Sequence, residues 1–154
     1  MAYSTAADVR SRIKSIGNTG DYTDAAIATH IARADNRLNA RLAQLYDGVP
    51  FSSTPPLVAD MSADLAAAYV LRFAYPPQTG AQGSTLADTY ESGVFGTDQK
   101  PGVMDQLASG ELNLIGADGT AIDRLQGAYA ATIKTPDTPY LDRDDMNDTF
   151  TLEP

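Results

Sequence analysis

The chain contains no cysteine and no tryptophan, and its single histidine is His30. Without cysteine it can form neither disulfides nor thiolate metal sites, and thiolate nucleophiles are excluded as well. A site that needs two imidazoles is excluded too. No apolar run reaches the roughly 18 residues of a membrane span, and the first ten residues lack the basic start and apolar stretch of a signal peptide. We therefore expect a soluble protein that stays in the compartment where it is made.

Basic residues are also scarce. The 154 residues include 11 Lys and Arg against 20 Asp and Glu, which gives a net charge of −9. This balance argues against a basic nucleic-acid-binding protein. The charge is unevenly placed: six basic and five acidic groups in residues 1–48 give +1, whereas five basic and fifteen acidic groups in 49–154 give −10. Such asymmetry favours head-to-tail contact between copies, although solubility alone would also account for it.

Motifs of catalysis are missing as well. The sequence has no nucleophile elbow, no glycine-rich phosphate loop and no HExxH. Asp60 and Asp64 lie one helical turn apart and could share a metal or a proton, but carboxylates at this spacing more often pair with arginines across a helix interface. Several arginines of the preceding helix are available for this pairing. We therefore expect no enzyme, no catalytic residue, no metal and no cofactor.

What the chain does have is helical periodicity in its first two thirds. Apolar residues recur at three- and four-residue spacing, and capping residues, glycines and prolines mark the ends. In the segment 54–74 the apolar residues extend around most of the helix, Phe73 included, which is typical of a central helix packed against several neighbours. The expected helices span residues 5–16, 23–46, 54–74, 84–95 and 101–109.

The last third differs in composition. Alternating polar and apolar residues around Asp118-Gly119 indicate a hairpin-like turn, so that 112–134 could hold a short β-hairpin, with 128–133 as one strand. The last twenty residues are rich in proline and acids and lack the apolar content to fold alone. Such a terminus is either disordered or ordered by a partner. Their acids do not fit the spacing of a calcium-binding EF-hand loop, so a solvated acidic tail is the better interpretation.

The predicted fold is therefore mainly α: a small bundle of four to five helices with an extended C-terminal arm. We expect a helical core domain over 1–115, followed by the hairpin or loop region and the arm over 116–154.

Three arginines form the most informative pattern. Arg33, Arg37 and Arg41 recur every four residues and make one stripe on the second helix, next to its apolar face. One interpretation is that their stems cover the edge of the core while their heads lie in water. The other is a basic ridge that contacts an acidic surface of another subunit.

Several phrases of the sequence together resemble a known family. They are a short helix after Tyr3-Ser4-Thr5, a long helix ending in the leucine-rich turn 42–46, the linker Val49-Pro50-Phe51, the helical phrase Ala63-Asp64-Leu65-Ala66, LASGELNLIG at 107–116 and YLDRDDMNDTF at 140–150. With these features the chain, above all residues 23–73, resembles the head-to-tail adaptor (connector) proteins of tailed bacteriophages. The glycine-rich stretch 76–100 departs from that pattern, in which a more continuous helix is expected.

The resemblance implies a structural virion protein of the neck. Connector subunits form a ring, commonly twelvefold, beneath the portal; the ring extends the DNA channel and receives the head-closure or tail-completion protein. DNA would pass through without sequence-specific binding, and no membrane is involved. The expected subunit-interface residues are Arg33, Arg37, Arg41, Asp60 and Asp64. The expected portal-docking residues of the arm are Tyr140, Leu141, Arg143, Met146 and Phe150.

An alternative function belongs to another class. An acidic helical module that binds and regulates a basic host or phage protein would have the same composition. The two functions differ in stoichiometry, because a connector forms a high-order ring and a regulator forms small complexes of fixed size.

Overall fold

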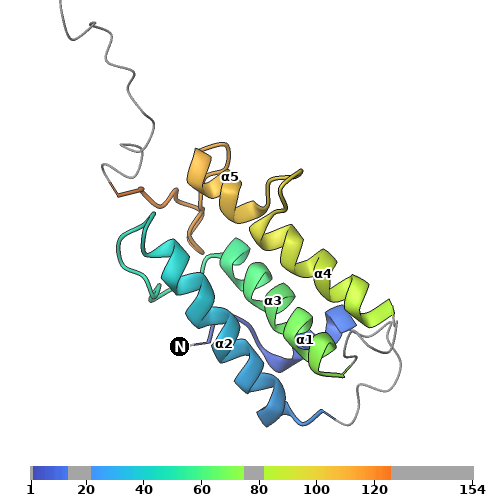
Figure 1. The fold of residues 1–154 in the computed structure, drawn as a ribbon. Helices are drawn as coiled ribbons and strands as arrows, with labels where there is room; N and C mark the ends of the chain where they lie inside the picture. The colour runs from blue at the N-terminus through green and yellow to red at the C-terminus, as the bar shows by residue number, and fades with distance from the viewer. Residues whose placement is uncertain (1, 14–21, 75–81, 126–154) are drawn as a thin grey trace, which may run out of the picture.

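The computed structural model describes residues 2–13, 22–74 and 82–125, and within them the chain is helical with almost no strand. The helices are α1 (Ala6–Ile13), α2 (Asp24–Leu42), α3 (Pro56–Ala74), α4 (Gln82–Phe95) and α5 (Val103–Ser109). Figure 1 shows α3 in the middle of the bundle, between α2 and α4. The expected mainly α bundle of four to five helices is confirmed, with five helices in the described residues.

α1 begins at the predicted cap. The Thr5 amide donates to Asp8 Oδ2 at 2.8 Å, and the Asp8 amide donates in return to Thr5 Oγ1 at 3.3 Å. This reciprocal pair is a capping box with aspartate in place of the usual glutamate. It holds the pKa of Asp8 below its ordinary value, through the side-chain and backbone hydrogen bonds with Thr5. The stop expected at Gly17 lies outside the described residues.

α2 starts at the expected cap, where Thr23 Oγ1 accepts the Ala26 amide at 3.2 Å. It ends at Leu42, four residues before the expected end at Tyr46. The chain tightens there into three-residue turns, with the Leu45 amide donating to the Leu42 carbonyl at 2.9 Å. Tyr46 is then buried and forms a β-bridge with Arg124. The helix stops early because Tyr46 pairs with a distant segment of the chain.

α3 is the central helix that its all-round apolar sequence predicts. It packs against α1, α2 and α4, and eleven of its residues are buried. The helix begins at its prolines as expected. The amides of a first helical turn have no acceptor within the helix, so the missing proline N–H costs no hydrogen bond. Phe73 departs from the expectation. It lies near the end of the helix and is 71% exposed.

The segment after α5 returns to the end of α2. Gly110 closes α5 with φ of +90°, a backbone conformation that favours glycine. A turn at Asp118-Gly119 follows, with one antiparallel bridge between Ile115 and Ala121. Leu114 is fully buried in the common core. The predicted hairpin turn is therefore present as a single bridge, and the strand expected at 128–133 lies outside the described residues.

No helix in the described ranges is both long and apolar enough to cross a lipid bilayer.

Candidate interaction surface

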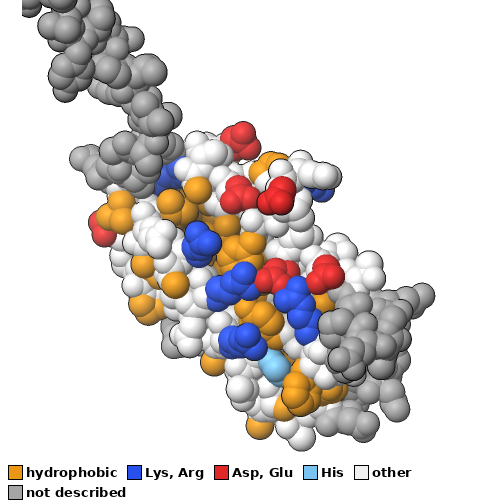
Figure 2. Space-filling view, in the orientation of Figure 1, with side chains coloured by type: hydrophobic (Ala, Val, Ile, Leu, Met, Phe, Trp, Pro, Cys, Tyr) orange, Lys and Arg blue, Asp and Glu red, His pale blue; other side chains and the backbone are white. Residues whose placement is uncertain are grey.

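The arginine stripe of α2 lies over aromatic rings. The Arg33 guanidinium is 4.6 Å from the centre of the Tyr69 ring, and that of Arg37 is 4.1 Å from the centre of the Phe95 ring. These distances are typical of cation–π contacts. These contacts support the first interpretation, in which the side chains cover the edge of the core; the contact with another subunit stays a prediction. Figure 2 shows basic side chains in a row across this face, with the pale blue histidine beside them.

Arg37 belongs to a small network with α3 and α4. It pairs with Glu91 and donates to the Tyr69 hydroxyl at 3.2 Å, while Arg72 pairs with the same Glu91 and with Asp88. Partial burial alone would raise the pKa of Glu91, but the hydrogen bonds and charges of the two arginines outweigh it and bring the pKa below its ordinary value. Arg37 is therefore held within its own subunit.

Arg41 is different from the other two arginines of the stripe. It is exposed, and no residue of the described segments accepts a hydrogen bond from it or pairs with its charge. The side chain borders a groove of about 170 Å³ between the end of α2 and α5. Leu45, Phe95 and Met104 give this groove apolar walls, and Asp105 is its one lining carboxylate.

The predicted acidic pair has a partner, but not the expected one. Arg12 of α1 donates from Nε to Asp64 at 2.6 Å and from an Nη atom to Asp60 at 2.7 Å. Pairing across a helix interface was predicted correctly, whereas the assignment of the α2 arginines as partners was wrong. Burial raises the pKa of Asp64 and exceeds the opposing effect of Arg12. Since the guanidinium bridges both carboxylates, it takes the place that a shared cation would need.

The structure thus divides the five expected interface residues into two groups. In the described segments no ion pair joins the α2 arginines to Asp60 or Asp64. In the same segments, no group of three or more His, Asp or Glu side chains has the arrangement of a metal site. The five expected residues of the C-terminal arm lie outside the described residues.

A buried polar network was missed from the sequence. Asp35 is 5% exposed; it accepts the Tyr3 amide at 3.0 Å and the Ser62 hydroxyl at 2.5 Å. Ser62 in turn contacts the Ser4 hydroxyl at 2.8 Å. The network ties the N-terminal segment to α2 and α3. The sequence held one signal for it: Asp35 directly follows Ala34, so around the helix it lies at the edge of the apolar stripe of α2.

Acidic side chains gather at one end of the bundle. Asp47, Asp98, Glu111 and Asp123 are all exposed, and within the described part of the chain none of them takes part in an ion pair. They lie in the segments after α2, α4 and α5, at the end of the bundle where α5 lies (Figure 1). Arg41, in the last turn of α2, lies at this same end of the bundle, so the acidic end adjoins the end of the arginine stripe.

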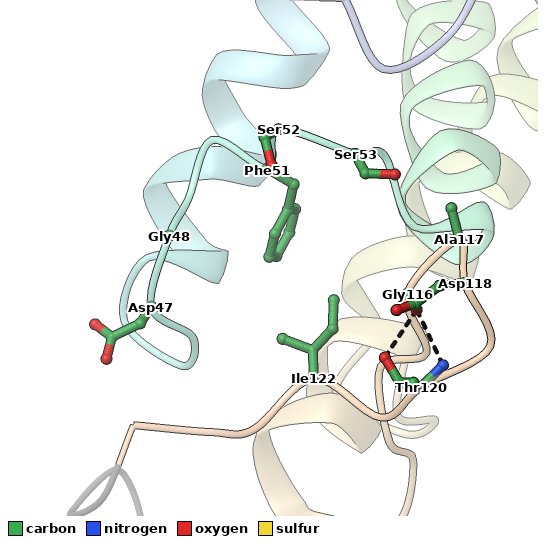
Figure 3. Close-up of a pocket in the computed structure, with 10 residues that line it drawn as sticks. All are labelled: Asp47, Gly48, Phe51, Ser52, Ser53, Gly116, Ala117, Asp118, Thr120 and Ile122. Atoms are coloured by element: carbon green, nitrogen blue, oxygen red, sulfur yellow. Dashed lines mark hydrogen bonds between the residues drawn. The ribbon is translucent and has the colours of Figure 1, made fainter.

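This acidic end also carries an open cavity of about 370 Å³, between the loop 47–53 and the turn at 116–122. Phe51 and Ile122 face each other across it, and Asp118 turns back to bond the Thr120 amide and hydroxyl (Figure 3). Asp47 points away from the cavity in the same view. The cavity therefore has two large apolar side chains, and most of its other lining residues are polar or glycine.

His30 lies beside the exposed Phe73, with ring centres 6.0 Å apart. Burial, and to a smaller degree the charge of Arg33, lower its pKa below the ordinary value. The imidazole is therefore mainly in its neutral form at pH 7. Its neighbours are an aromatic ring and an arginine, so its surroundings give it no partner for proton transfer among the described residues.

No protein-family model matches the chain, and no curated protein is significantly similar to it in sequence.

Proposed function

We propose that the chain is a ring-forming connector subunit in the neck of a tailed bacteriophage. In this role it would sit beneath the portal, join the head to the tail and extend the DNA channel. The resemblance of residues 23–73 and of the phrases around them supports this role. A structural function also agrees with the described surface, whose main features are charged side chains, a groove and an open cavity.

One observation carries the proposal: the described part of the chain leaves Arg41 without a partner, and four exposed acidic residues without an ion pair lie in the segments after α2, α4 and α5. A ring needs a heterologous contact, in which one surface of a subunit meets a different surface of the next. Complementary charges on two such surfaces steer the contact and set its direction. Arg41 has no partner in the described part of its own subunit, so its charge is available to a neighbouring subunit.

The acidic surface is compatible with a DNA channel. Duplex DNA binds proteins chiefly through the release of counterions when Lys and Arg neutralise its phosphates. Residues 49–125, which exclude the arm, carry three basic and nine acidic groups, so a channel lined by them would offer few such cations. DNA would therefore slide along it without being held.

The C-terminal arm is the proposed portal contact. Tyr140, Leu141, Met146 and Phe150 would anchor it in the portal, with Arg143 and the acids forming a polar rim. The head-closure or tail-completion protein would bind the opposite face of the ring.

Sedimentation with the portal encoded in the same genome tests this function. The full chain, a chain truncated after Thr135 and the Arg41→Glu variant are each mixed with purified portal and separated on a density gradient. Co-migration of many copies, lost on truncation and weakened by Arg41→Glu, is the expected result. Co-migration that survives truncation would remove the arm from the proposal. Absence of co-migration for the full chain would overturn the connector role and favour the regulatory module.

A further inference from the structure

The groove beside Arg41 has the properties of a peptide-binding surface. Its walls include the apolar side chains of Leu45, Phe95 and Met104, and two arginines stand on its α2 side. Asp105 is the opposing charge, but its Oδ2 atom already accepts the Gly102 amide at 3.0 Å. A ligand for this groove should therefore combine carboxylates with aromatic or aliphatic anchors.

The chain itself carries such a segment. Residues 126–154 contain six acidic and two basic residues, a net charge of −4. Between the acids stand four large apolar side chains, of Tyr140, Leu141, Met146 and Phe150. No other stretch of the sequence combines so many acids with aromatic residues.

The described chain ends close to the groove. The Leu125 amide donates to the carbonyl of Leu45 at 3.0 Å, and Leu45 lines the groove. The described part of the chain therefore ends beside the groove. The eleven residues 126–136 can span up to about 36–40 Å, whereas the stripe from Arg33 to Arg41 is only about 12 Å long at 1.5 Å per residue. A tether of this kind gives an effective concentration in the millimolar range, so that even a weak contact is populated.

We propose that in the unassembled subunit residues 137–150 bind in the groove between α2 and α5 of their own chain, with their carboxylates at Arg41. The contact covers the arginine that would otherwise meet a second copy. The inference goes beyond the proposed function, because it concerns the isolated chain and holds or fails without a portal.

The absence of cysteine allows a direct test in the full chain. A Thr149→Cys variant carries a single nitroxide label, and amide signals of the isotope-labelled protein are recorded with the label oxidised and reduced. We expect selective broadening of residues 41–45 and 104–108 at low salt. The broadening should be lost at 1 M salt, because the screening length falls from about 10 Å at 0.1 M to about 3 Å.

Two variants show whether the groove carries the contact. Arg41→Glu, made in the Thr149→Cys background, should abolish the broadening, and no described contact of the fold is lost with it. Lys100→Glu is the matched control, since it makes the same change of charge at another exposed site, and the broadening should remain. Broadening that persists in Arg41→Glu, or that both variants lose equally, would overturn the proposal.

A mixed sample separates the chain's own tail from that of a second copy. Spin-labelled protein without isotopes is mixed with isotope-labelled protein that lacks the spin label. Broadening in the mixed sample as strong as in the single-chain sample would show that the occupant is a neighbour and would overturn the intramolecular contact. Absence of broadening in both samples would overturn it as well. Neither result depends on portal binding, so the proposed function is judged separately.

Discussion

Removal of Arg12 should destabilise the fold more than removal of any exposed cation. Arg12 bridges Asp60 and Asp64, and only 22% of its side chain is exposed, with 33% for Asp64 and 70% for Asp60. Exposed ion pairs contribute about 0.2–1 kcal/mol, whereas breaking a fully buried pair costs about 3–5 kcal/mol. The half-buried Asp64 lies between these limits. We expect Arg12→Ala to lower the free energy of unfolding by about 1.5–2 kcal/mol at pH 7.

The assay is thermal unfolding followed by circular dichroism. For a chain of this size 1 kcal/mol corresponds to roughly 2–4 °C, so the expected loss in Tm is about 3–8 °C. Arg10→Ala is the matched control, because Arg10 lies on the same helix and pairs with Asp24, whose side chain is 77% exposed. The control should lose about 0.5–1 kcal/mol.

The effect should depend on pH in a defined direction. Burial raises the pKa of Asp64, and Arg12 opposes that shift, so loss of Arg12 raises the pKa further. A carboxyl whose pKa is raised on folding favours the folded state at low pH, and that contribution is lost as the pH rises through the folded pKa. The destabilisation by Arg12→Ala should therefore be full at pH 7 and shrink as acid protonates Asp64.

A double-mutant cycle provides the decisive comparison. Asp64→Asn removes the charge, so Arg12→Ala should cost about 1 kcal/mol less in that background. If Arg12→Ala cost no more than Arg10→Ala, or if it cost the same with Asp64→Asn present, the reasoning about the half-buried carboxylate would be refuted.

Three further changes test other parts of the account. Asp35→Ala should cost about 2–3 kcal/mol in urea unfolding, because two buried donors lose their acceptor; a cost below 0.5 kcal/mol would show that water replaces the carboxylate. Gly96→Ala should destabilise the fold by about 1–3 kcal/mol, since φ is +80° and a Cβ would lie 2.3 Å from another side chain. Gly93 lies on α4 with no atom close to the position of a Cβ, so Gly93→Ala should be neutral or stabilising by up to about 1 kcal/mol. Millimolar magnesium or calcium should leave the Tm unchanged, and a rise that Asp64→Asn abolishes would restore the metal-dependent alternative for Asp60 and Asp64.

Local signals explain why the helices could be predicted. The Thr5 and Asp8 capping box, the prolines before α3 and the all-round apolar face of α3 each act within a few residues of the chain. Such signals need no knowledge of the tertiary arrangement. They placed all five helices to within a few residues wherever the structure describes their ends.

Features set by distant contacts could not be predicted in the same way. α2 ends early because Tyr46 pairs with Arg124, 78 positions further along the chain. The partner of Asp60 and Asp64 depends on which helix packs against that face of α3, and this helix is α1 rather than α2. Asp35 was missed because an acidic residue at the edge of an apolar stripe usually faces water, and its two donors come from other segments.

The candidate surface was predicted in part. The four-residue spacing correctly placed Arg33, Arg37 and Arg41 on one face. Spacing could not show that Arg37 is held by Glu91 while Arg41 remains available, because α4 supplies the carboxylate. That difference is the reason for choosing Arg41 as the site of the charge reversals.

The connector role is tested most directly by counting subunits in the complex with the portal. Native mass spectrometry of the purified complex, with particle averages viewed along the portal axis, gives the number and arrangement of copies. The account predicts a closed ring of many copies, of the order of twelve, on one face of the portal. One or two copies bound without rotational symmetry, or a small stable complex with a basic protein in place of the portal, would contradict it.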